Sequence, residues 1–527
     1  MLALTQPDLA GALRLHFGHA EFREGQTDVI DSLLAGRDTV AVMPTGRGKS
    51  LCYQLPALLL PGATVVVSPL VALMKDQTDA LAARGIAATF INSSLDPAEQ
   101  HERISAMEEG AWRLVYVAPE RFRQPAFVAA VARARISLFA VDEAHCISDW
   151  GHQIRPDYLR LPEAIAACGR PPVLACTATA TPEVREDLSL QLGLSDPSVV
   201  VSGFDRPNLR YVVRFAPGRE AKRAWLMRIL GAVPGSQIVY AATRRGVEEV
   251  AEFLGRSGVP CAAYHAGLPD EARSAAQDRF MTGAVRVIVA TNAFGMGIDK
   301  ADVRGVVHYD LPGSLEAYYQ EAGRAGRDGR TAFCTLLYSA ADRKLREFLI
   351  DRSDLAGGEA AELDPALVAR RRRLDHARLA RMVSYAYAER CRRNVILQYF
   401  GERKAGACGR CDVCTGQVGS AVQAPPPVPA APRVAASNPR ERRERAVAST
   451  LAADPALFEA LRARRAEIAK EEAVPAFVVF HDATLLEMAA HKPRTAREFA
   501  ALKGVGARKL ERYGAFFLAV VNRHLGR

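Results

Sequence analysis

Eight short apolar runs, separated by helix-like stretches, dominate the chain from about residue 25 to residue 340. They read DTVAVM, ATVVVSPL, WRLVYVAP, SLFAVDEA, PPVLACTA, SQIVYAAT, VRVIVAT and RGVVHYDL. Strands that alternate with helical segments form parallel sheets whose crossover helices cover the faces. Eight strands are too many for one compact unit, so we predict two α/β domains with a joint at residues 201–220.

The rest of the chain has a different character. From Arg370 to Phe400 the sequence predicts an arginine-rich helix that leads into a group of cysteines. Residues 415–439 hold six prolines and one charged residue, Arg433, a composition that cannot bury a core and predicts a flexible linker. Helical patterning returns at 440–527, with apolar positions at Leu457, Leu461, Phe477, Phe480, Leu485, Met488, Leu502, Leu510 and Phe517.

We therefore predict an α/β chain with two parallel-sheet domains in tandem, followed by two smaller helical parts. The predicted bounds are 1–205 and 206–350 for the two α/β domains, 351–414 for a helical cysteine-bearing module, 415–445 for the Pro/Ala-rich linker and 446–527 for a small all-α domain. A typical domain has about 150 residues, so a chain of 527 residues has room for these cores.

Charge and cysteine usage narrow the class of protein. The formal net charge of +10 is compatible with a nucleic acid or an anionic surface as partner. The chain has no long apolar run and no signal-like start, so we expect neither a membrane span nor export. Of its ten cysteines, four crowd into Cys391 to Cys414, which predicts a metal site in a reducing cytoplasm rather than a disulfide scaffold.

A phosphate-binding loop is predicted at MPTGRGKS, between the run DTVAVM and the helix-like stretch LCYQLPALLL. A strand, a small-residue loop and a helix N-terminus offer a triphosphate backbone N–H groups, a positive dipole end, a lysine and a hydroxyl. We expect Lys49 to reach the β and γ phosphates and Ser50 to hold Mg²⁺. Met43 replaces the leading glycine of the strict pattern, so an ordinary turn is the alternative. The other expected nucleotide contacts in the loop are Thr45, Gly46 and Gly48.

Two carboxylates, Asp142 and Glu143, stand at the end of another predicted strand, in LFAVDEAHC. A strand-end carboxylate can bind Mg²⁺, and its neighbour can orient or deprotonate the attacking water. We predict Asp142 as the metal residue and Glu143 as the catalytic base. An isolated Asp-Glu pair is commonly a solvated loop or a helix cap, but a pair that follows a phosphate loop favours catalysis.

Two arginines, Arg324 and Arg327, lie in YYQEAGRAGRDG of the second α/β domain. If this stretch is helix, they share one face, and guanidinium groups neutralise charge that develops on a γ-phosphate. We predict both as arginine fingers that reach across a cleft between the domains. The alternative is an arginine-rich surface helix, but the small residues around the arginines favour close approach.

The ordered motifs resemble those of superfamily 2 helicases and, more narrowly, those of the RecQ family of DNA helicases, over residues 10–414 and again in the tail. The resemblance implies that both α/β domains are RecA-like motor domains. FGHAEFREGQTDVI is similar to the family's adenine-recognising motif, which implies that Gln26 reads the base edge with Arg23 nearby. VATNAFGMGIDK resembles the motif that joins the second domain to both ligands, and we assign its Gly297 and Asp299 to the nucleotide.

Several other motifs resemble those that contact DNA in this family. SPLVALMKDQ, which begins at Ser68, and YVAPERF resemble motifs that touch the DNA backbone, and TAT at 177–179 resembles the segment that couples the ATP and DNA sites. HCISDWGHQIRPDY resembles the aromatic-rich loop that senses single-stranded DNA, with Trp150, His152 and Arg155 at the matching positions. An exposed Trp stacks on an unpaired base, worth about 1–3 kcal/mol; a Trp buried to pack the loop is the alternative.

The cysteine group predicts a metal site. Cys391 is followed by CGRCDVC, which supplies Cys408, Cys411 and Cys414. Four thiolates at this spacing close a tetrahedral shell and leave no position for water, so we expect a structural Zn²⁺. An iron–sulfur cluster is the alternative. The resemblance to the RecQ zinc-binding module favours zinc.

Residues 450–527 resemble the HRDC domain, a small helical module that binds nucleic acid or protein, through VVFHDATLLEMA and LKGVGARKLERYG. Two glycines in the second motif let backbone N–H groups approach a phosphate, and the adjacent Lys509 is our candidate nucleic-acid contact. A glycine turn between packed helices is the alternative. Many RecQ proteins carry a winged-helix domain before this tail, but the interval from Thr415 to about Arg445 cannot hold one.

From these motifs we predict an ATP-dependent DNA helicase and translocase of the cytoplasm. The resemblance implies 3′-to-5′ movement on single strands and a role in recombination and repair. The expected cofactors are ATP, Mg²⁺ and structural Zn²⁺, and the expected partners are single-stranded and partly duplex DNA and single-stranded-DNA-binding or other repair proteins. The alternatives are an ATPase that remodels or anneals strands, an RNA helicase and a non-catalytic nucleic-acid scaffold. The complete set of lysine, acid, base and arginines argues against the scaffold.

The positive charge is unevenly distributed. Residues 1–363 hold 39 basic and 43 acidic side chains, whereas residues 364–414 hold 12 and 5 and residues 440–527 hold 17 and 11. The predicted motor is therefore slightly acidic. We predict that the appended modules supply most of the salt-dependent affinity for DNA.

Overall fold

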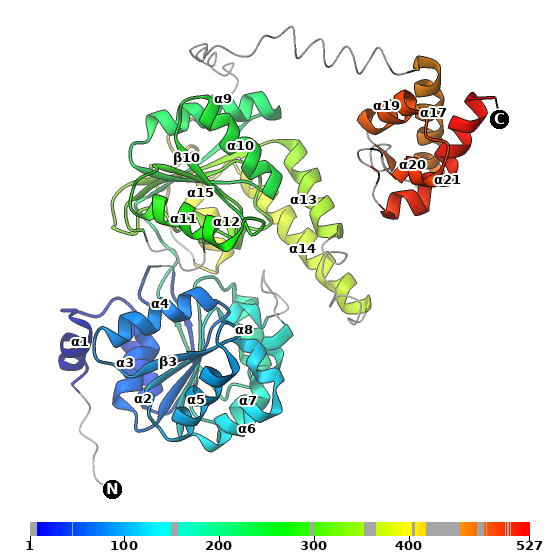
Figure 1. Ribbon diagram of the computed structural model, residues 1–527. Coiled ribbons are helices and arrows are strands. Elements are labelled where there is room, and N and C mark those ends of the chain that lie inside the picture. Colours follow the sequence, from blue (N-terminus) through cyan, green and yellow to red (C-terminus); the bar gives the residue numbers. More distant parts are fainter. Residues whose placement is uncertain are drawn as a thin grey trace. The chain divides into compact units, whose positions relative to one another are not determined.

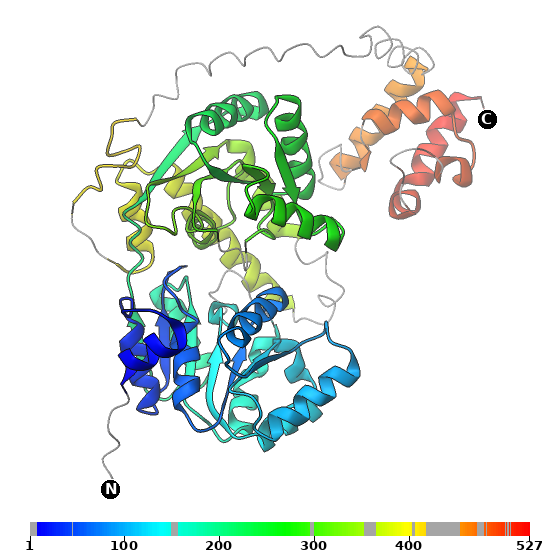
Figure 2. The ribbon, with the colours of Figure 1, turned by 60° about the vertical axis from the view of Figure 1, so that its left-hand side comes forward.

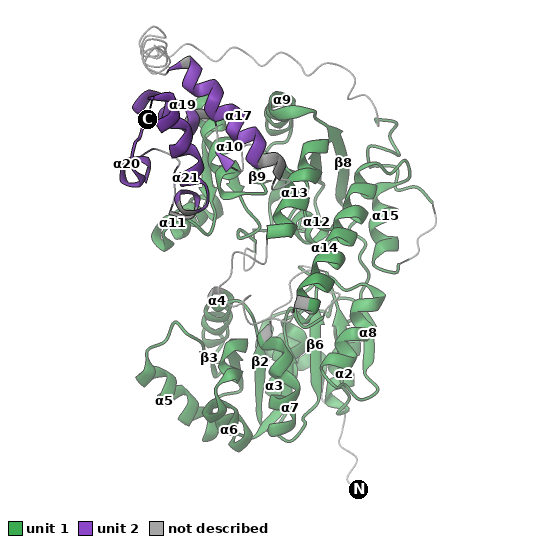
Figure 3. Ribbon diagram, turned by 90° about the vertical axis from the view of Figure 1, so that its right-hand side faces the viewer, with its two compact units in different colours: residues 1–429 green, residues 430–527 purple. Residues whose placement is uncertain are grey.

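The computed structural model describes residues 8–44, 46–148, 156–295, 300–352, 365–402, 406–417, 454–471, 479–480, 482–500, 502, 505 and 507–526. The chain divides into two compact units, residues 1–429 and 430–527 (Figure 3). The first unit contains two parallel sheets, coloured blue to cyan and green in Figure 1, and the second unit is small and helical.

The first sheet has seven strands in the order β3-β4-β2-β5-β6-β1-β7, and every neighbouring pair is parallel. Four of its five inner strands, β1, β2, β4 and β6, are buried along their length because helices cover the sheet, as continuous runs of Val, Ala and Leu require. The strands are β1 Thr39–Val42, β2 Ala63–Val67, β3 Ala88–Ile91, β4 Leu114–Val117, β5 Ile136–Val141, β6 Val173–Thr177 and β7 Ser198–Val201. The helices are α1 Leu9–Phe17, α2 Gln26–Leu34, α3 Leu51–Leu59, α4 Val71–Ala82, α5 Pro97–Glu108, α6 Pro125–Arg133, α7 Leu161–Ala167 and α8 Pro182–Gln191.

The second sheet lies in the part of the chain drawn mainly in green in Figure 2. It has six strands in the order β10-β11-β9-β12-β13-β8, again all parallel. The strands are β8 Leu209–Phe215, β9 Ser236–Tyr240, β10 Cys261–Tyr264, β11 Val287–Ala290, β12 Val303–His308 and β13 Ala332–Tyr338. The helices are α9 Gly218–Ala232, α10 Arg244–Arg256, α11 Asp270–Met281, α12 Leu315–Ala322 and α13 Ala340–Arg352. The predicted fold class, two tandem parallel-sheet domains followed by helical parts, is confirmed.

Each of the eight apolar runs contains a strand, but five strands had not been predicted: β3, β7, β8, β10 and β13. Four of these five lie at the outer edges of the sheets, where one side is open and the apolar signal is weak. In β7, for example, half-buried and exposed residues alternate. The predicted joint at 201–220 contains β8, so the connection between the sheets is shorter than expected and covers residues 202–208.

The arginine-rich stretch is not one helix, as had been expected for Arg370 to Phe400, but two: α14 Pro365–Ala386 and α15 Arg392–Tyr399. The break has a clear cause at Arg392, whose buried guanidinium donates hydrogen bonds to the carbonyls of Tyr385 and Ala386. A cationic side chain satisfies the last carbonyls of a helix and interacts favourably with its dipole. The chain therefore turns at Cys391 and brings that cysteine toward the other three.

Within its described residues, the second unit contains α17 Pro455–Glu471, α19 Asp482–His491, α20 Ala496–Ala500 and α21 Ala507–His524. Its core confirms most of the predicted apolar positions, whereas Leu510 is partly buried and Phe477 lies outside the described residues. Most of the predicted linker also lies outside them. Among the described residues, no helix is both long and apolar enough to cross a membrane. The confirmed core positions are Leu457, Leu461, Phe480, Leu485, Met488, Leu502 and Phe517.

Candidate functional site

Three neighbouring strands of the first sheet bring the predicted nucleotide-binding residues to one edge. In the order β5-β6-β1, the carboxyl ends of the strands lead into Asp142, Ala178 and Met43, respectively. Parallel strands end at the same edge, so the loop at 43–50 and the carboxylates at 142–143 are neighbours in space although far apart in sequence. The sequence could not show this adjacency, because it depends on strand order.

Two glycines shape the phosphate loop. Gly46 and Gly48 have φ angles of +84° and +79°, which L-residues with side chains rarely adopt. A Cβ on Gly48 would lie 2.7 Å from Nε2 of Gln26, so a side chain there would displace the Gln26 amide that donates to the loop. Lys49 lies beside the loop, with its Nζ 3.4 Å from the carbonyl oxygen of Met43. Thr45 lies outside the described residues.

The side chains of Gln26 and Arg23, which precede this loop in the sequence, form hydrogen bonds with it. Nε2 of Gln26 donates hydrogen bonds to the carbonyls of Arg47 and Gly48, at 3.2 and 3.0 Å, and Oε1 accepts one from the backbone N–H of Arg23. The Arg23 guanidinium donates to the carbonyl of Gly46. Gln26 is only 2% exposed. Both residues thus lie at the expected place, and base reading by Gln26 stays a prediction.

Asp142 is a buried carboxylate close to Lys49. Its Oδ1 accepts hydrogen bonds from the N–H of Glu143 at 3.0 Å and from the thiol of Cys176 at 3.5 Å. Burial, and then repulsion from Glu143, raise the pKa of Asp142 to about 6, while Lys49 opposes the rise. Two carboxylates beside one lysine favour a cation at this point, which fits the predicted metal-ion role.

Glu143 has φ of +48°, a left-handed conformation that is costly for a residue with a side chain. Its Oε2 lies 3.3 Å from Nδ1 of His145, which in turn lies 2.9 Å from Oγ1 of Thr177. Thr177 ends β6 and begins the TAT segment. The chain Glu143–His145–Thr177 thus connects the candidate base to that segment. Sequence reasoning assigned no role to His145, although it stands in the same motif.

The two candidate arginine fingers do not share a helix face, because α12 ends at Ala322 and both arginines lie in the turn that follows. Arg327 lies next to the phosphate loop: a Cβ on Gly46 would be 3.6 Å from Cγ of Arg327. Arg324 is buried instead, and its guanidinium donates a hydrogen bond to the carbonyl of Gly295. Gly297 and Asp299 lie outside the described residues.

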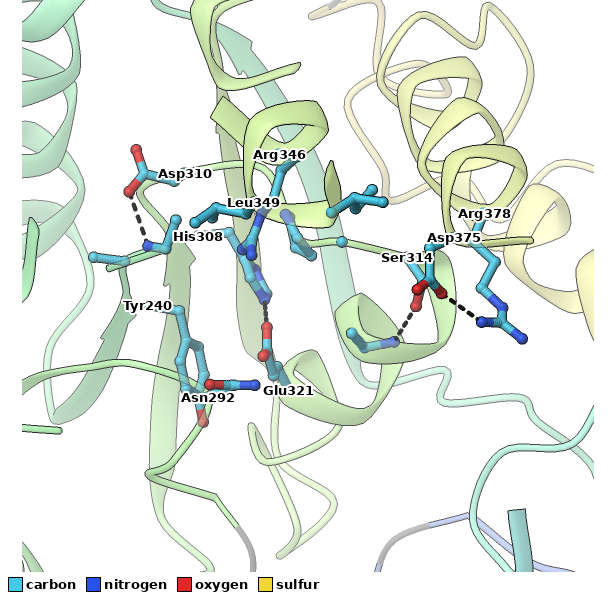
Figure 4. Close-up of a pocket in the computed structure, with 16 residues that line it drawn as sticks. Tyr240, Asn292, His308, Asp310, Ser314, Glu321, Arg346, Leu349, Asp375 and Arg378 are labelled. Atoms are coloured by element: carbon cyan, nitrogen blue, oxygen red, sulfur yellow. Dashed lines mark hydrogen bonds and ion pairs between the residues drawn. The ribbon is translucent and has the colours of Figure 1, made fainter. Parts of the chain in front are cut away.

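A pocket of about 280 Å³ opens at the carboxyl ends of β9 and β12, beside α12 (Figure 4). Strand order reverses between these two strands, which is where α/β sheets commonly bind ligands. His308 is buried at the end of β12, and its Nε2 lies 2.8 Å from Oε2 of Glu321 on α12. The sequence did not indicate this pair, since nothing in the motifs points to the end of β12.

The four predicted cysteines come together. Their Sγ atoms all lie within 4.8 Å of one another, and those of Cys408 and Cys414 are 3.8 Å apart. Zn–S bonds of about 2.3 Å in a tetrahedron place sulfurs about 3.8 Å apart, so the cluster fits a metal bound by four thiolates. Backbone N–H groups of Arg410 and Cys411 point to Sγ of Cys408, at 3.5 and 3.3 Å, as hydrogen bonds to metal-bound thiolates do.

The structure describes two of the five residues predicted to contact nucleic acid. Trp150, His152 and Arg155 lie outside the described residues. Ser68 follows β2 at the same edge as the phosphate loop but is only 2% exposed. Lys509 lies on α21, with its Nζ 5.3 Å from the centroid of the Phe480 ring. The roles assigned to these five residues therefore stay predictions.

Four known sequence profiles match successive parts of the chain. They are the DEAD/DEAH box helicase profile at 23–188, the helicase conserved C-terminal domain at 221–329, the RecQ zinc-binding profile at 340–415 and the HRDC domain at 454–521. Among solved structures, the DUF1998 helicase MrfA bound to DNA is similar, with a TM-score of 0.52, 19% identity and coverage of 67% of this chain and 51% of that chain. Dbp5 of S. cerevisiae bound to RNA and ADP BeF3 matches with a TM-score of 0.51, 19% identity and coverage of 64% and 89%.

Two tandem parallel-sheet domains that match the DEAD/DEAH box helicase and helicase C-terminal profiles place the chain among helicases with two RecA-like domains. Relatives of similar sequence identify the family within this class. The chain is 35% identical to "ATP-dependent DNA helicase RecQ" of Pasteurella multocida (strain Pm70), over 96% of this chain and 92% of the relative. It is equally similar to the protein of the same name from Bacillus subtilis (strain 168), over 97% of each chain. The chain therefore belongs to the RecQ family of ATP-dependent DNA helicases.

Proposed function

We propose that this protein couples Mg²⁺-ATP hydrolysis to 3′-to-5′ movement on single-stranded DNA and to duplex unwinding in recombination and repair. One observation carries the proposal: Lys49, Asp142, Glu143 and Arg327 converge on one loop although they come from two different sheets. A site shared by two domains links the chemistry to their relative movement, because closing the domains completes the site.

Each side chain has a distinct role in this proposal. Lys49 binds the β and γ phosphates, and Asp142 and Ser50 hold Mg²⁺, which supplies positive charge to the phosphate oxygens when bound. Glu143 orients the attacking water and takes its proton, with His145 fixing the carboxylate. Arg327, and Arg324 once released from the Gly295 carbonyl, stabilise charge on the γ-phosphate.

The cysteine cluster supports a structural Zn²⁺ in this proposal, held by Cys391, Cys408, Cys411 and Cys414. Four thiolates leave no open position, so the ion stabilises the fold and takes no part in the reaction. We further propose a cytoplasmic protein whose partners are single-stranded and partly duplex DNA and, among proteins, single-stranded-DNA-binding or other repair proteins.

The second candidate function is an ATPase that unwinds duplex DNA only weakly. The alignment with the Pasteurella protein spans 602 positions, more than the 527 residues of this chain, so that relative has residues this chain lacks. The short interval after Cys414 is where a winged-helix domain would stand in the resemblance. An ATPase that remodels or anneals strands follows if duplex ends are not split.

One assay separates these possibilities. ATP turnover and strand separation are measured on a 3′-tailed duplex, a 5′-tailed duplex, a blunt duplex and an RNA-tailed duplex, with Lys49→Ala as the inactive control. The proposal predicts DNA-stimulated turnover and separation of the 3′-tailed duplex. Turnover without separation favours remodelling, and the absence of DNA-stimulated turnover contradicts the motor.

A further inference from the structure

The connection between the two sheets touches the turn that carries the candidate arginine fingers. The Arg206 guanidinium donates three hydrogen bonds to that turn, to the carbonyls of Gly323 at 3.2 Å, Ala325 at 2.9 Å and Gly326 at 3.2 Å. These carbonyls follow the end of α12, where a cation also interacts favourably with the helix dipole. One side chain of the connection thus binds three carbonyls of the turn.

Asn208 adds two bonds from the same segment. Its Nδ2 donates to the carbonyls of Gly326 at 2.8 Å and of Arg330 at 2.9 Å. A Cβ on Gly326 would lie 2.5 Å from Nδ2 of Asn208, and Gly326 has φ of +58°. The absence of a side chain at Gly326 therefore leaves room for Asn208, a role that the sequence pattern alone did not indicate.

The connection between the two sheets also contacts the cysteine-bearing module. The Arg393 guanidinium pairs with the carboxylate of Asp205, and the backbone N–H of Phe204 donates to Glu402 at 2.7 Å. The ring of Phe204 stacks on Phe400, with centroids 4.4 Å apart. Residues 204 and 205 thus contact the cysteine-bearing module, while residues 206 and 208 contact the arginine turn.

We propose that Arg206, assisted by Asn208, is a positioning residue for ATP hydrolysis, which holds the 323–326 turn so that Arg327 stays beside the phosphate loop. This inference rests on the proposed role of Arg327. Hydrogen bonds from a neighbouring segment fix a catalytic group to within a fraction of an ångström, and a small misplacement costs large factors in rate. Arg206 acts on the rate of hydrolysis through the turn, whose carbonyls accept its hydrogen bonds.

The test uses the full chain with four single variants: Arg206→Ala, Arg206→Lys, Asn208→Ala and Arg210→Ala. Arg210 is the matched control, because it is an exposed arginine of the neighbouring strand β8 whose guanidinium lies over the ring of Phe333. We expect Arg206→Ala to lower kcat for DNA-stimulated ATP turnover about tenfold, with KM for ATP changed less than about twofold. Arg206→Lys recovers part of kcat, Asn208→Ala has a smaller effect and Arg210→Ala none.

A double variant tells positioning from general destabilisation. If Arg206 acts through the turn, Arg206→Ala adds no further loss of kcat to that of Arg327→Ala, since the placed group is already gone. Losses that multiply, or a normal kcat in Arg206→Ala, overturn the proposal. An equal loss in Arg210→Ala does so too.

Amide hydrogen exchange gives a readout that does not need activity. Exchange at residues 323–330 is expected to be faster in Arg206→Ala than in the wild type and unchanged elsewhere in the second sheet. Unchanged exchange in that turn contradicts the positioning role. A wild-type chain without DNA-stimulated turnover contradicts the proposed function instead, so the two failures are distinguishable.

Discussion

Arg392 and Asp412 form a buried ion pair, 3.0 Å between Nε and Oδ1, with side chains 1% and 0% exposed. Each partner stands next to a cysteine of the cluster, Cys391 and Cys411. Asp412 also accepts a hydrogen bond from the N–H of Val213 on β8, at 2.9 Å, and Arg392 caps the end of α14. The pair therefore joins the cysteine cluster to the second sheet and to the arginine-rich helix.

The substitution Asp412→Ala should lower the free energy of local unfolding at residues 391–417. The change leaves the Arg392 charge buried without its carboxylate and the N–H of Val213 without an acceptor, which costs about 3–5 kcal/mol. Native-state hydrogen exchange at residues 391–417 measures that local opening free energy. The matched control is Glu252→Ala, which removes an ion pair with Arg256 whose side chains are about two-thirds exposed; it should change stability by less than about 0.5 kcal/mol. Equal effects in both variants contradict the prediction.

Loss of the bound metal should lower the ATP turnover of the two α/β domains through the same contacts. We expect Cys411→Ser to lower bound zinc, measured by atomic absorption, and to reduce DNA-stimulated ATP turnover, because the cluster supports the ion pair and the Phe204–Phe400 stack. Cys261→Ser is the control, since Cys261 lies on β10 away from the cluster. Full turnover in a zinc-free Cys411→Ser protein would show that the module is dispensable for hydrolysis.

Glu143→Gln separates binding from chemistry. The amide keeps the shape of the side chain but cannot take a proton, so kcat for ATP hydrolysis should fall about 10²–10⁴-fold. KM for ATP should stay within a few-fold, because the phosphates are bound by the loop and Lys49. Steady-state kinetics on single-stranded DNA measure both constants, with exposed Glu186→Gln as control. A large rise in KM at normal kcat would assign Glu143 to binding.

Acid should destabilise the second unit through Asp454. Hydrogen bonds from Lys492, then from His524 and from the N–H of Leu457, hold the pKa of Asp454 well below its usual range. A carboxyl whose pKa is depressed by folding stabilises the native state above its unfolded pKa, about 3.9, and loses that contribution as pH falls. The contribution of Asp454 to the stability of the second unit should thus be complete above about pH 5 and decline below about pH 4.

Asp454→Asn should lower the thermal midpoint of the second unit at about pH 7 and flatten its decline in acid. Circular dichroism of residues 430–527, which have their own core, follows this transition. Glu459→Gln is the control, because both side chains of its ion pair with Arg462 are more than half exposed. An identical acid profile in Asp454→Asn and the wild type would contradict the assignment.

Local sequence patterns were sufficient for the fold class and for naming the candidate site residues that the structure brings together. Runs of Val, Ala and Leu between helix-like stretches identify inner strands because both faces of a covered parallel sheet are buried. Lys49 and the four cysteines were predictable because a phosphate loop and a four-thiolate metal site need these residue types at short, fixed spacings. Edge strands such as β7 and β10 were missed, since one open side weakens the apolar pattern.

The sequence by itself determined the two-sheet architecture, the phosphate loop, the carboxylate pair and the cysteine set, because each depends on residues that are close in the chain. Only the tertiary structure decided which of these groups meet. Strand order placed Asp142 beside Lys49, and the end of α12 at Ala322 put the arginines in a turn held by Arg206. The physical reason is that side-chain chemistry is local to the sequence, whereas contacts between distant segments depend on how buried surfaces pack and which polar groups must be satisfied.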